Sequence, residues 1–474
     1  MSRLVALFII PLLFFWAPSA FASADSGYRI IGAYPLNEEV AFVVMNESSN
    51  VLYLVFYNGS SFRAEKLNIS EEYHIVHWNG NSWLLQKGER GTVGLYIYNG
   101  TLEHVKTFKN GSLCTDNDLQ IRWNGKEYLI TFLGKGREDL STGECIFRFK
   151  NYLLSGDRLI PLNATGSGMW VPGLNAWLVG ESLVDENGRV IGKYNFSKTG
   201  VYSVGLAVDG NKTLVVVSSD GGWIRVFALE NSSLILVYSK KLGKWELGND
   251  PRPPNIWTGK PILIGYESGD TLVPTLWLFN GTDFMKIKTE FKTSTSLDPI
   301  FCSDQGYILA STPVNVTKRG GLLHLELYTF KDSSLSKVSS LEVKWGYVRV
   351  INAAEFWGFP VPEIERGEIL VVSNGDYIFL FNSSHAVNLL SGMVFKLPEP
   401  LHDGRYWVAP YCGGWIVFNE EKVYFFKNGR FRDITQEMLS ALHGKKNRVS
   451  LTAVILGGLV LVAVVLIVAL RKRG

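Results

Sequence analysis

The chain has 474 residues, of which 19% are charged and 46% are hydrophobic, a balance that excludes a largely disordered protein. Its formal net charge is +3, yet residues 25–444 hold 40 Lys and Arg against 44 Asp and Glu, a net charge of −4. A nucleic-acid-binding protein needs a basic face on its folded domain. Nucleic acid is therefore excluded as an expected partner.

The first 24 residues carry the features of a secretory signal peptide. Arg3 precedes the apolar stretch LVALFIIPLLFFWA, and Ala22 and Ala24 supply small residues for a cleavage site. A short apolar core between a positive end and a small-residue site is typical of a signal that is removed. We therefore expect residues 1–24 to be cleaved and the rest of the chain to be exported.

Residues 25–434 repeat one pattern, in which short aromatic and β-branched strands are separated by Asn-Gly or related turns. Two-residue Asn-Gly turns match the twist of β-hairpins, and such strands favour sheets. The third turn of each unit falls at Asn58, Asn99, Asn151, Asn187, Asn231, Asn280, Lys331, Asn382 and Asn428. A period of roughly 40–50 residues with four strands per unit predicts an all-β fold, a β-propeller.

The number of blades is less clear than the fold. Nine units can be counted, but the fourth, residues 169–194, is short enough to be half a blade. Single propellers typically have about four to eight blades. We therefore predict one propeller of eight four-stranded blades, with seven and nine left open.

The unit from Tyr202 to Leu242 is the most regular one. Its segment AVDGNKTLVVVSSDGGWIRVFAL resembles the WD40-like and PQQ-like propeller repeats, in which strands are joined by Asp-Gly turns. No Trp-Asp dipeptide closes the strand, and Tyr238 stands where PQQ-type repeats place Trp. The resemblance implies a propeller and transfers no catalytic residue.

The longest insertion in the repeat, Lys344 to Glu368, is unusually aromatic. Propeller ligands commonly meet loops at one end of the central channel, and aromatic faces on a rigid rim can stack on sugars or peptide side chains. We predict a recognition surface here, although packing between blades is the alternative. Its residues are Trp345, Phe356, Trp357, Phe359, Glu363 and Glu365.

Glycosylation and disulfide signals agree with export. Asn-x-Ser/Thr sequons, which mark N-glycosylation sites, stand at Asn46, Asn58, Asn68, Asn99, Asn110, Asn163, Asn195, Asn211, Asn231, Asn280, Asn315 and Asn382. All four cysteines follow the signal peptide, and four cysteines allow three pairings. We predict a Cys114–Cys145 bridge within one unit, and Cys302 with Cys412 as a second candidate pair.

A search for catalytic or metal-binding patterns finds none. His74 and His77 lie three apart in an expected strand, so they face opposite sides and are poorly placed to share a metal. The carboxylates between Glu363 and Glu368 could serve glycoside hydrolysis only at a defined separation, which a sequence does not give. We expect no enzyme activity, no cofactor and no metal.

The C-terminal end predicts a membrane anchor. A helical stem is expected over residues 435–448, followed by an apolar run over 449–470 that is long enough to span a bilayer. A buried soluble helix is the alternative for this run. The basic tail, residues 471–474, fits the cytoplasmic side, which gives a single-pass, type I topology with the propeller outside.

These features favour a membrane-anchored extracytoplasmic propeller that binds a glycan, a peptide or an envelope protein. The alternatives are a structural envelope component without a ligand and an extracytoplasmic carbohydrate-active hydrolase or lyase. With its single signal, dense sequons and bare basic tail, the chain resembles archaeal cell-surface glycoproteins in style.

Overall fold

The structure is a computed structural model that describes residues 27–443 apart from several gaps. The gaps are residues 37, 70–71, 90–91, 110–118, 140–143, 197–201, 210–211, 220–222, 231–232, 242–254, 258–261, 268–272, 292–293, 303–304, 318–319, 332–333, 353–357, 376 and 403. The predicted signal peptide, the predicted membrane span and the basic tail lie outside the described residues. Among the described residues no helix is long and apolar enough to cross a membrane.

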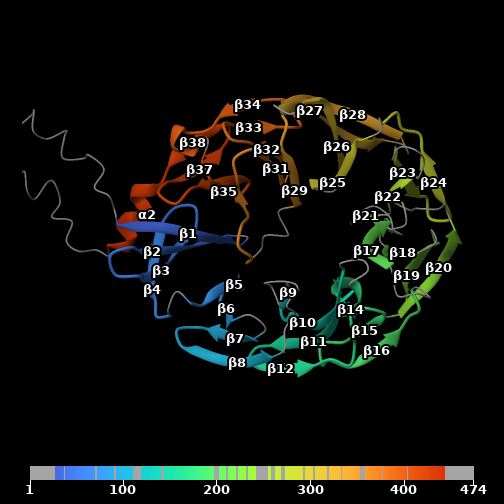
Figure 1. Cartoon of the computed structure of the whole chain (residues 1–474), viewed down its shortest axis with the longest axis horizontal. Helices are drawn as coiled ribbons and strands as arrows, with labels where there is room; N and C mark the ends of the chain where they lie inside the picture. The colour runs from blue at the N-terminus through green and yellow to red at the C-terminus, as the bar shows by residue number, and fades with distance from the viewer. Residues whose placement is uncertain are drawn as a thin grey trace, which may run out of the picture.

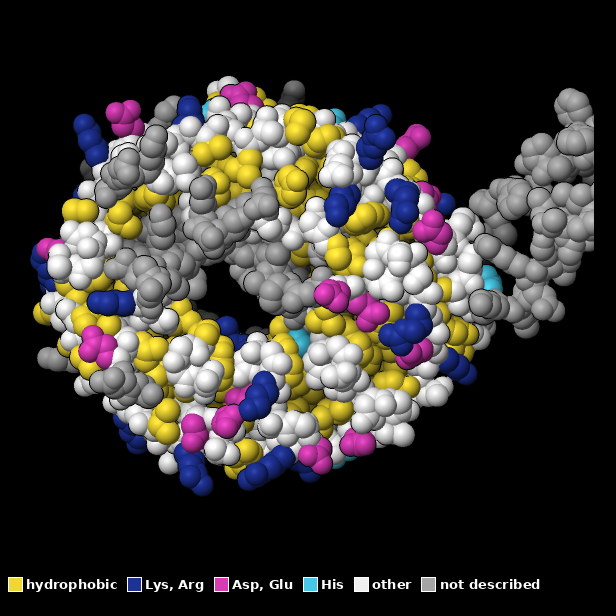
Figure 2. All heavy atoms as spheres, turned by 180° about the vertical axis from the view of Figure 1, so that it is seen from behind, with side chains coloured by type: hydrophobic (Ala, Val, Ile, Leu, Met, Phe, Trp, Pro, Cys, Tyr) yellow, Lys and Arg dark blue, Asp and Glu magenta, His cyan; other side chains and the backbone are white. Residues whose placement is uncertain are grey.

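The described strands form nine sheets that follow one another around a ring, as the blades of a β-propeller do (Figure 1). We number the blades 1 to 9 in chain order. Seen from behind, the ring is hollowed at its centre, and basic and acidic side chains are intermixed over this face (Figure 2).

Blades 1 to 5 are four-stranded antiparallel sheets. Their strands are, in turn, β1 (Tyr28–Pro35), β2 (Val40–Asn46), β3 (Val51–Tyr57) and β4 (Phe62–Leu67); β5 (His74–Trp78), β6 (Trp83–Glu89), β7 (Thr92–Tyr98) and β8 (Leu102–Lys109); β9 (Leu119–Trp123), β10 (Tyr128–Asp139), β11 (Glu144–Ser155) and β12 (Arg158–Pro161); β13 (Gly168–Val171), β14 (Ala176–Val179), β15 (Ser182–Val184) and β16 (Val190–Lys193); β17 (Tyr202–Asp209), β18 (Lys212–Ser219), β19 (Trp223–Glu230) and β20 (Ser233–Lys241).

Blades 6 and 7 are also four-stranded, whereas blades 8 and 9 have five strands each. Their strands are, in turn, β21 (Asn255–Trp257), β22 (Ile262–Glu267), β23 (Val273–Phe279) and β24 (Phe284–Ile287); β25 (Ser296–Cys302), β26 (Gln305–Thr317), β27 (Gly320–Lys331) and β28 (Ser334–Lys344); β29 (Tyr347–Asn352), β31 (Glu368–Asn374), β32 (Tyr377–Phe381), β33 (His385–Asn388) and β34 (Val394–Lys396); β30 (Glu363–Ile364), β35 (Tyr406–Tyr411), β36 (Gly414–Phe418), β37 (Val423–Lys427) and β38 (Arg430–Asp433).

The repeated Asn-Gly turns form as the sequence predicts. In the turn between β5 and β6, the side-chain oxygen of Asn79 accepts hydrogen bonds from the backbone N–H groups of Asn81 (3.0 Å) and Ser82 (2.8 Å). Gly80 has φ +96°, a conformation that costs glycine little. The same side-chain bonding recurs at Asn124 and Asn280, so each turn is stabilised locally and fixes the register of its hairpin.

The nine sheets correct the prediction of eight blades, within the range left open. The short fourth unit is a complete blade whose strands have only three or four residues each. Its Trp177 is fully buried, and the indole Nε1 donates to Glu127 of blade 3 at 2.8 Å. One large buried side chain thus compensates for strands that are too short to bury much surface.

Blades 8 and 9 exchange strands. After β29, which pairs parallel to β31 in blade 8, the chain crosses to blade 9 and adds β30 beside β35 before it returns. Between these strands the chain also bonds to blades 1 and 2. The N–H of Gly358 donates to the Pro35 carbonyl (2.8 Å), and its carbonyl accepts from the Trp78 N–H (2.6 Å). We call residues 358–362 the crossing segment.

The predicted stem helix is part of the packed body. It forms as α2 (Thr435–Leu442) and contacts β3 and β4 of blade 1. Met438 is 1% exposed and belongs to the largest apolar core, which also joins blades 1, 8 and 9. The sequence did not indicate this packing, because only the fold shows that the helix packs against blade 1.

Candidate functional site

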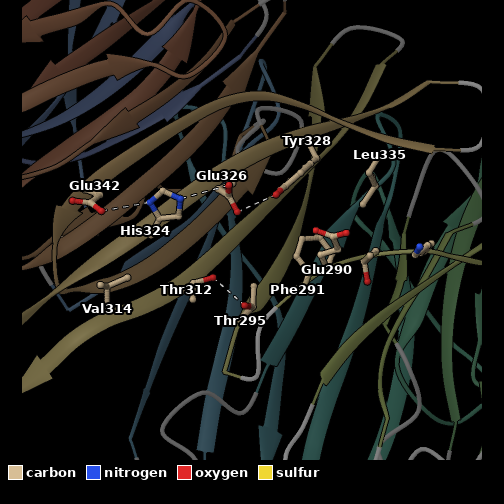
Figure 3. Close-up of a pocket in the computed structure, with 12 residues that line it drawn as sticks. Glu290, Phe291, Thr295, Thr312, Val314, His324, Glu326, Tyr328, Leu335 and Glu342 are labelled. Atoms are coloured by element: carbon tan, nitrogen blue, oxygen red, sulfur yellow. Dashed lines mark hydrogen bonds and ion pairs between the residues drawn. The ribbon is translucent and has the colours of Figure 1, made fainter.

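A cavity of about 660 Å³ opens on the face of blade 7 that looks toward blade 6 (Figure 3). The connection that leaves β24, residues 288–291, forms one wall. Strands β26, β27 and β28 form the other wall with His324, Glu326, Tyr328, Glu342, Thr312 and Val314. We call this cavity the blade 6–7 pocket.

The pocket exists because neighbouring strands differ in length. Strands β26 and β27 have 13 and 12 residues, whereas β24 of blade 6 has four. Blade 7 therefore extends past the apolar core that it shares with blade 6. Beyond that core its side chains meet open space, where polar groups remain hydrated.

Strand alternation explains which side chains face the pocket. Successive residues of a strand point to opposite faces. Leu323, Leu325 and Leu327 are buried in the core shared with blade 8. The intervening His324 and Glu326, with Tyr328, consequently lie on the face toward blade 6, where the pocket is lined.

The polar groups form a connected chain across the wall (Figure 3). The two ring nitrogens of His324 lie 3.5 Å from a Glu326 oxygen and 3.8 Å from a Glu342 oxygen. The Tyr328 hydroxyl donates to the other Glu326 oxygen at 2.9 Å, and the Lys337 ammonium donates to Glu326 at 3.2 Å. The imidazole is thereby held between two carboxylates.

The protonation states suit binding better than acid catalysis. Burial alone would raise the pKa of Glu326, but hydrogen bonds from Tyr328 and Lys337 outweigh it and hold that pKa below its usual value. Burial, with the neighbouring Glu326 carboxylate, raises the pKa of Tyr328 to about 12. At neutral pH the wall therefore presents an ionised carboxylate and a neutral phenol.

Two aromatic rings and two threonines form a further part of the lining. The Phe291 and Tyr328 rings meet edge to face with centroids 5.6 Å apart, and Thr295 and Thr312 share a hydrogen bond of 2.9 Å. Within the described part of the chain, no group of three or more His, Cys, Asp or Glu could hold a metal ion. The pocket thus offers hydrogen-bond acceptors beside two aromatic rings.

Only two of the four aromatic residues predicted for the recognition surface lie within the described part of the chain. Trp345 is 45% exposed beside blade 7, and its backbone N–H donates to the Gly321 carbonyl. Phe359 lies instead against the His77 ring of blade 2, with centroids 4.4 Å apart. Phe356 and Trp357 lie outside the described residues, so the surface as a whole stays a prediction.

The two predicted polar partners, Glu363 and Glu365, both lie within the described residues. Glu363 forms an ion pair with Arg405 at 3.2 Å. Glu365 is exposed in the turn that follows β30, and its N–H donates to the Glu368 carboxylate at 3.0 Å. Both residues are placed by contacts within blades 8 and 9.

The cysteines and sequons are described only in part. Cys412 is exposed in the turn between β35 and β36. The side chains of Cys114, Cys145 and Cys302 lie outside the described part of the structure, so both disulfide predictions stay predictions. Among the sequons, exposed side chains are found at Asn58, Asn68, Asn99, Asn163, Asn195, Asn280 and Asn315. Asn110, Asn211 and Asn231 lie outside the described residues.

The sequence analysis missed the blade 6–7 pocket. The available signal is the stretch His324 to Tyr328, in which polar residues alternate with leucines. A strand with one apolar and one charged face is unusual in a propeller, because each blade packs both of its faces against neighbouring blades. The pattern alone does not reveal that blade 6 ends early.

Comparison with known proteins finds only remote structural similarity. No known family and no curated protein matches the chain. Apo AztD from Citrobacter koseri is similar over 78% of this chain and 94% of its own, with 12% identity and a TM-score of 0.35. A structure from a study of two prolyl endopeptidases matches 85% of this chain and 55% of its own, with 11% identity and a TM-score of 0.40.

A third similar structure is an ulvan lyase of polysaccharide lyase family PL25, bound to a glucuronate–sulfated rhamnose unit. It matches 79% of this chain and 92% of its own, with 8% identity and a TM-score of 0.33. These are distant matches to β-propeller proteins. Likenesses this remote say nothing about the ligand or the activity of this chain.

Proposed function

We propose that the chain is a membrane-anchored extracytoplasmic β-propeller that binds a glycan, a peptide or an envelope protein. The observation that carries the proposal is the blade 6–7 pocket, in which His324 lies between two carboxylates. The apolar run over residues 449–470 and the signal-like residues 1–24 support the export and the anchoring. In this proposal the WD40-like repeats serve as a scaffold, in the style of archaeal surface glycoproteins.

The pocket recognises hydroxyl or ammonium groups of the ligand. Ligand pockets typically have volumes of roughly 300–1,000 Å³. The blade 6–7 pocket lies within that range, with a lining that is mostly polar. Glu326 and Glu342 accept hydrogen bonds, while Phe291 and Leu335 supply apolar surface for the rest of the ligand. Because Tyr328 and Lys337 already hold Glu326, the acceptor is oriented before the ligand arrives.

The two alternatives have less support. A ligand-free structural component has no need of a carboxylate that is 19% exposed and faces a cavity. A hydrolase needs a general acid near neutral pH, and Glu326, with its lowered pKa, is ionised there and does not supply one.

The test is a glycan and peptide array probed with residues 25–444 in three forms. We expect the wild type to bind a discrete set of ligands, His324→Ala to lose that set, and His104→Ala to retain it. His104 is a matched control because it is an exposed histidine on outer strand β8 of blade 2. A set that survives His324→Ala, or an array without any ligand, would overturn the proposed function.

A further inference from the structure

A second cavity, of about 410 Å³, lies between blades 2 and 3. Its rim consists of the turn after β5, the turn after β9, and Asn99 in the turn between β7 and β8. Trp123 and Tyr128 supply aromatic surface from blade 3. We call this cavity the blade 2–3 pocket, and it is separate in sequence and in place from the blade 6–7 pocket.

The aromatic surface is held rigid from beneath. The Trp123 and Tyr128 rings pack with centroids 4.3 Å apart. The Tyr128 hydroxyl lies 2.9 Å from Nδ1 of His77, which is fully buried. A flat indole that is fixed in this way is pre-organised to stack on a ligand ring.

The polar rim combines amide and charged side chains. Asn81, Glu103 and Asp157 are exposed around the opening, and their side chains make no hydrogen bond or ion pair with other described residues. The Asn81 amide both donates to and accepts from hydroxyl groups, whereas the carboxylates of Glu103 and Asp157 only accept. One aromatic face with several uncommitted amide and carboxylate groups suits a sugar ring, which has an apolar face and a hydroxyl-bearing edge.

Asn99, which lines this cavity, is itself a predicted N-glycosylation site. It begins the sequon Asn99-Gly100-Thr101. Its side-chain oxygen accepts from the Thr101 hydroxyl at 3.1 Å, so the oxygen is directed to its own turn. The amide nitrogen, to which an N-linked glycan attaches, makes no hydrogen bond within the described residues.

We propose that the blade 2–3 pocket is a saccharide subsite, occupied by the first sugar of a glycan on Asn99 that stacks on Trp123. This proposal depends on the extracytoplasmic location in the proposed function, because only an exported chain is glycosylated there. The first sugar then fills the space between blades 2 and 3 and contacts both blades. The same chemistry would also accept a free saccharide.

The test uses residues 25–444 secreted from a host that N-glycosylates. Glycopeptide mass spectrometry should find a glycan on Asn99 in the wild type and in Thr101→Ser, which keeps the sequon, and none in Asn99→Gln. Thermal unfolding should show Asn99→Gln to be less stable than Thr101→Ser. Asn81→Ala should lower the melting temperature in the glycosylated background and leave it unchanged in the Asn99→Gln background.

A second arm distinguishes the sources of the sugar. Unglycosylated Asn99→Gln protein is titrated with N-acetylglucosamine and with glucose while tryptophan fluorescence is recorded. A saturable change that Asp157→Ala abolishes, with Trp123 kept as the fluorophore, supports the subsite even when Asn99 carries no glycan. The absence of both the stability coupling and the saccharide response would overturn the proposal. Ligand binding at the blade 6–7 pocket is read separately, so either proposal can fail alone.

Discussion

Replacing Gly358 with alanine should detach the crossing segment from blades 1 and 2. Gly358 has φ +76°, which L-residues rarely adopt. A Cβ at this position would overlap the carbonyl oxygen of Trp78 and the ring of His77. The overlapped atoms are backbone and a fully buried ring, so neither can move aside without disturbing blade 2.

The magnitude follows from the bonds that anchor the segment. Three backbone hydrogen bonds join it to the neighbouring blades, at Pro35, Trp78 and Ala33. Each such bond contributes about 1 kcal/mol net, and alanine in the left-handed region costs about 1–2 kcal/mol. We expect Gly358→Ala to lower the free energy of unfolding by about 4–5 kcal/mol.

The assay is chemical denaturation of residues 25–444, with Gly367→Ala as the matched control. Gly367 has a similar φ of +85°, but no atom lies within 4 Å of where its Cβ would be. The free energy of unfolding of Gly367→Ala should therefore fall only by the cost of alanine in the left-handed region, about 1–2 kcal/mol. Equal losses for the two variants would refute the role of the crossing segment as an anchor.

Three further predictions concern a buried carboxyl group, a helix contact and a disulfide bridge. Burial raises the pKa of Asp298 from 3.8 to about 6, so folding favours its protonated form and the wild type should lose stability as pH rises from 4 to 7. Relative to Asp298→Asn, the loss should approach about 3 kcal/mol in denaturation curves recorded across that range; a constant difference would contradict this. Met438→Ala should cost about 2–5 kcal/mol if α2 is part of the core, whereas a free stem would lose almost nothing. Non-reducing peptide mapping should recover Cys114 linked to Cys145, and free thiols there would refute the bridge.

Local features made the propeller predictable. Asn79 and Asn124 close their turns with their own side chains, so the hairpins are encoded within a few residues. The count of blades was less certain, because the strands of the fourth unit are short and their stability depends on Trp177 contacting blade 3. That contact joins residues 50 apart and is invisible to local patterns.

The blade 6–7 pocket could not be predicted from local patterns, because it also depends on contacts between residues far apart in the sequence. His324, Glu326 and Tyr328 alternate visibly in the sequence, but their exposure depends on how far blade 6 extends beside them. The contact of Phe359 with the His77 ring of blade 2 was likewise hidden from the sequence, because it joins distant parts of the chain.

The central claim is that the blade 6–7 pocket binds the ligand, and the dissociation constant of Tyr328→Phe tests it most directly. The substitution removes one hydroxyl, and with it the hydrogen bond that orients Glu326, while the ring that packs on Phe291 remains. A hydrogen bond to a charged group contributes about 1.5–3 kcal/mol. Because this bond is present with and without ligand and Lys337 also holds Glu326, only part of that energy is lost from binding. We therefore expect isothermal titration with an array-identified ligand to show a dissociation constant that is higher than that of the wild type by up to roughly tenfold. A dissociation constant equal to that of the wild type would contradict the account.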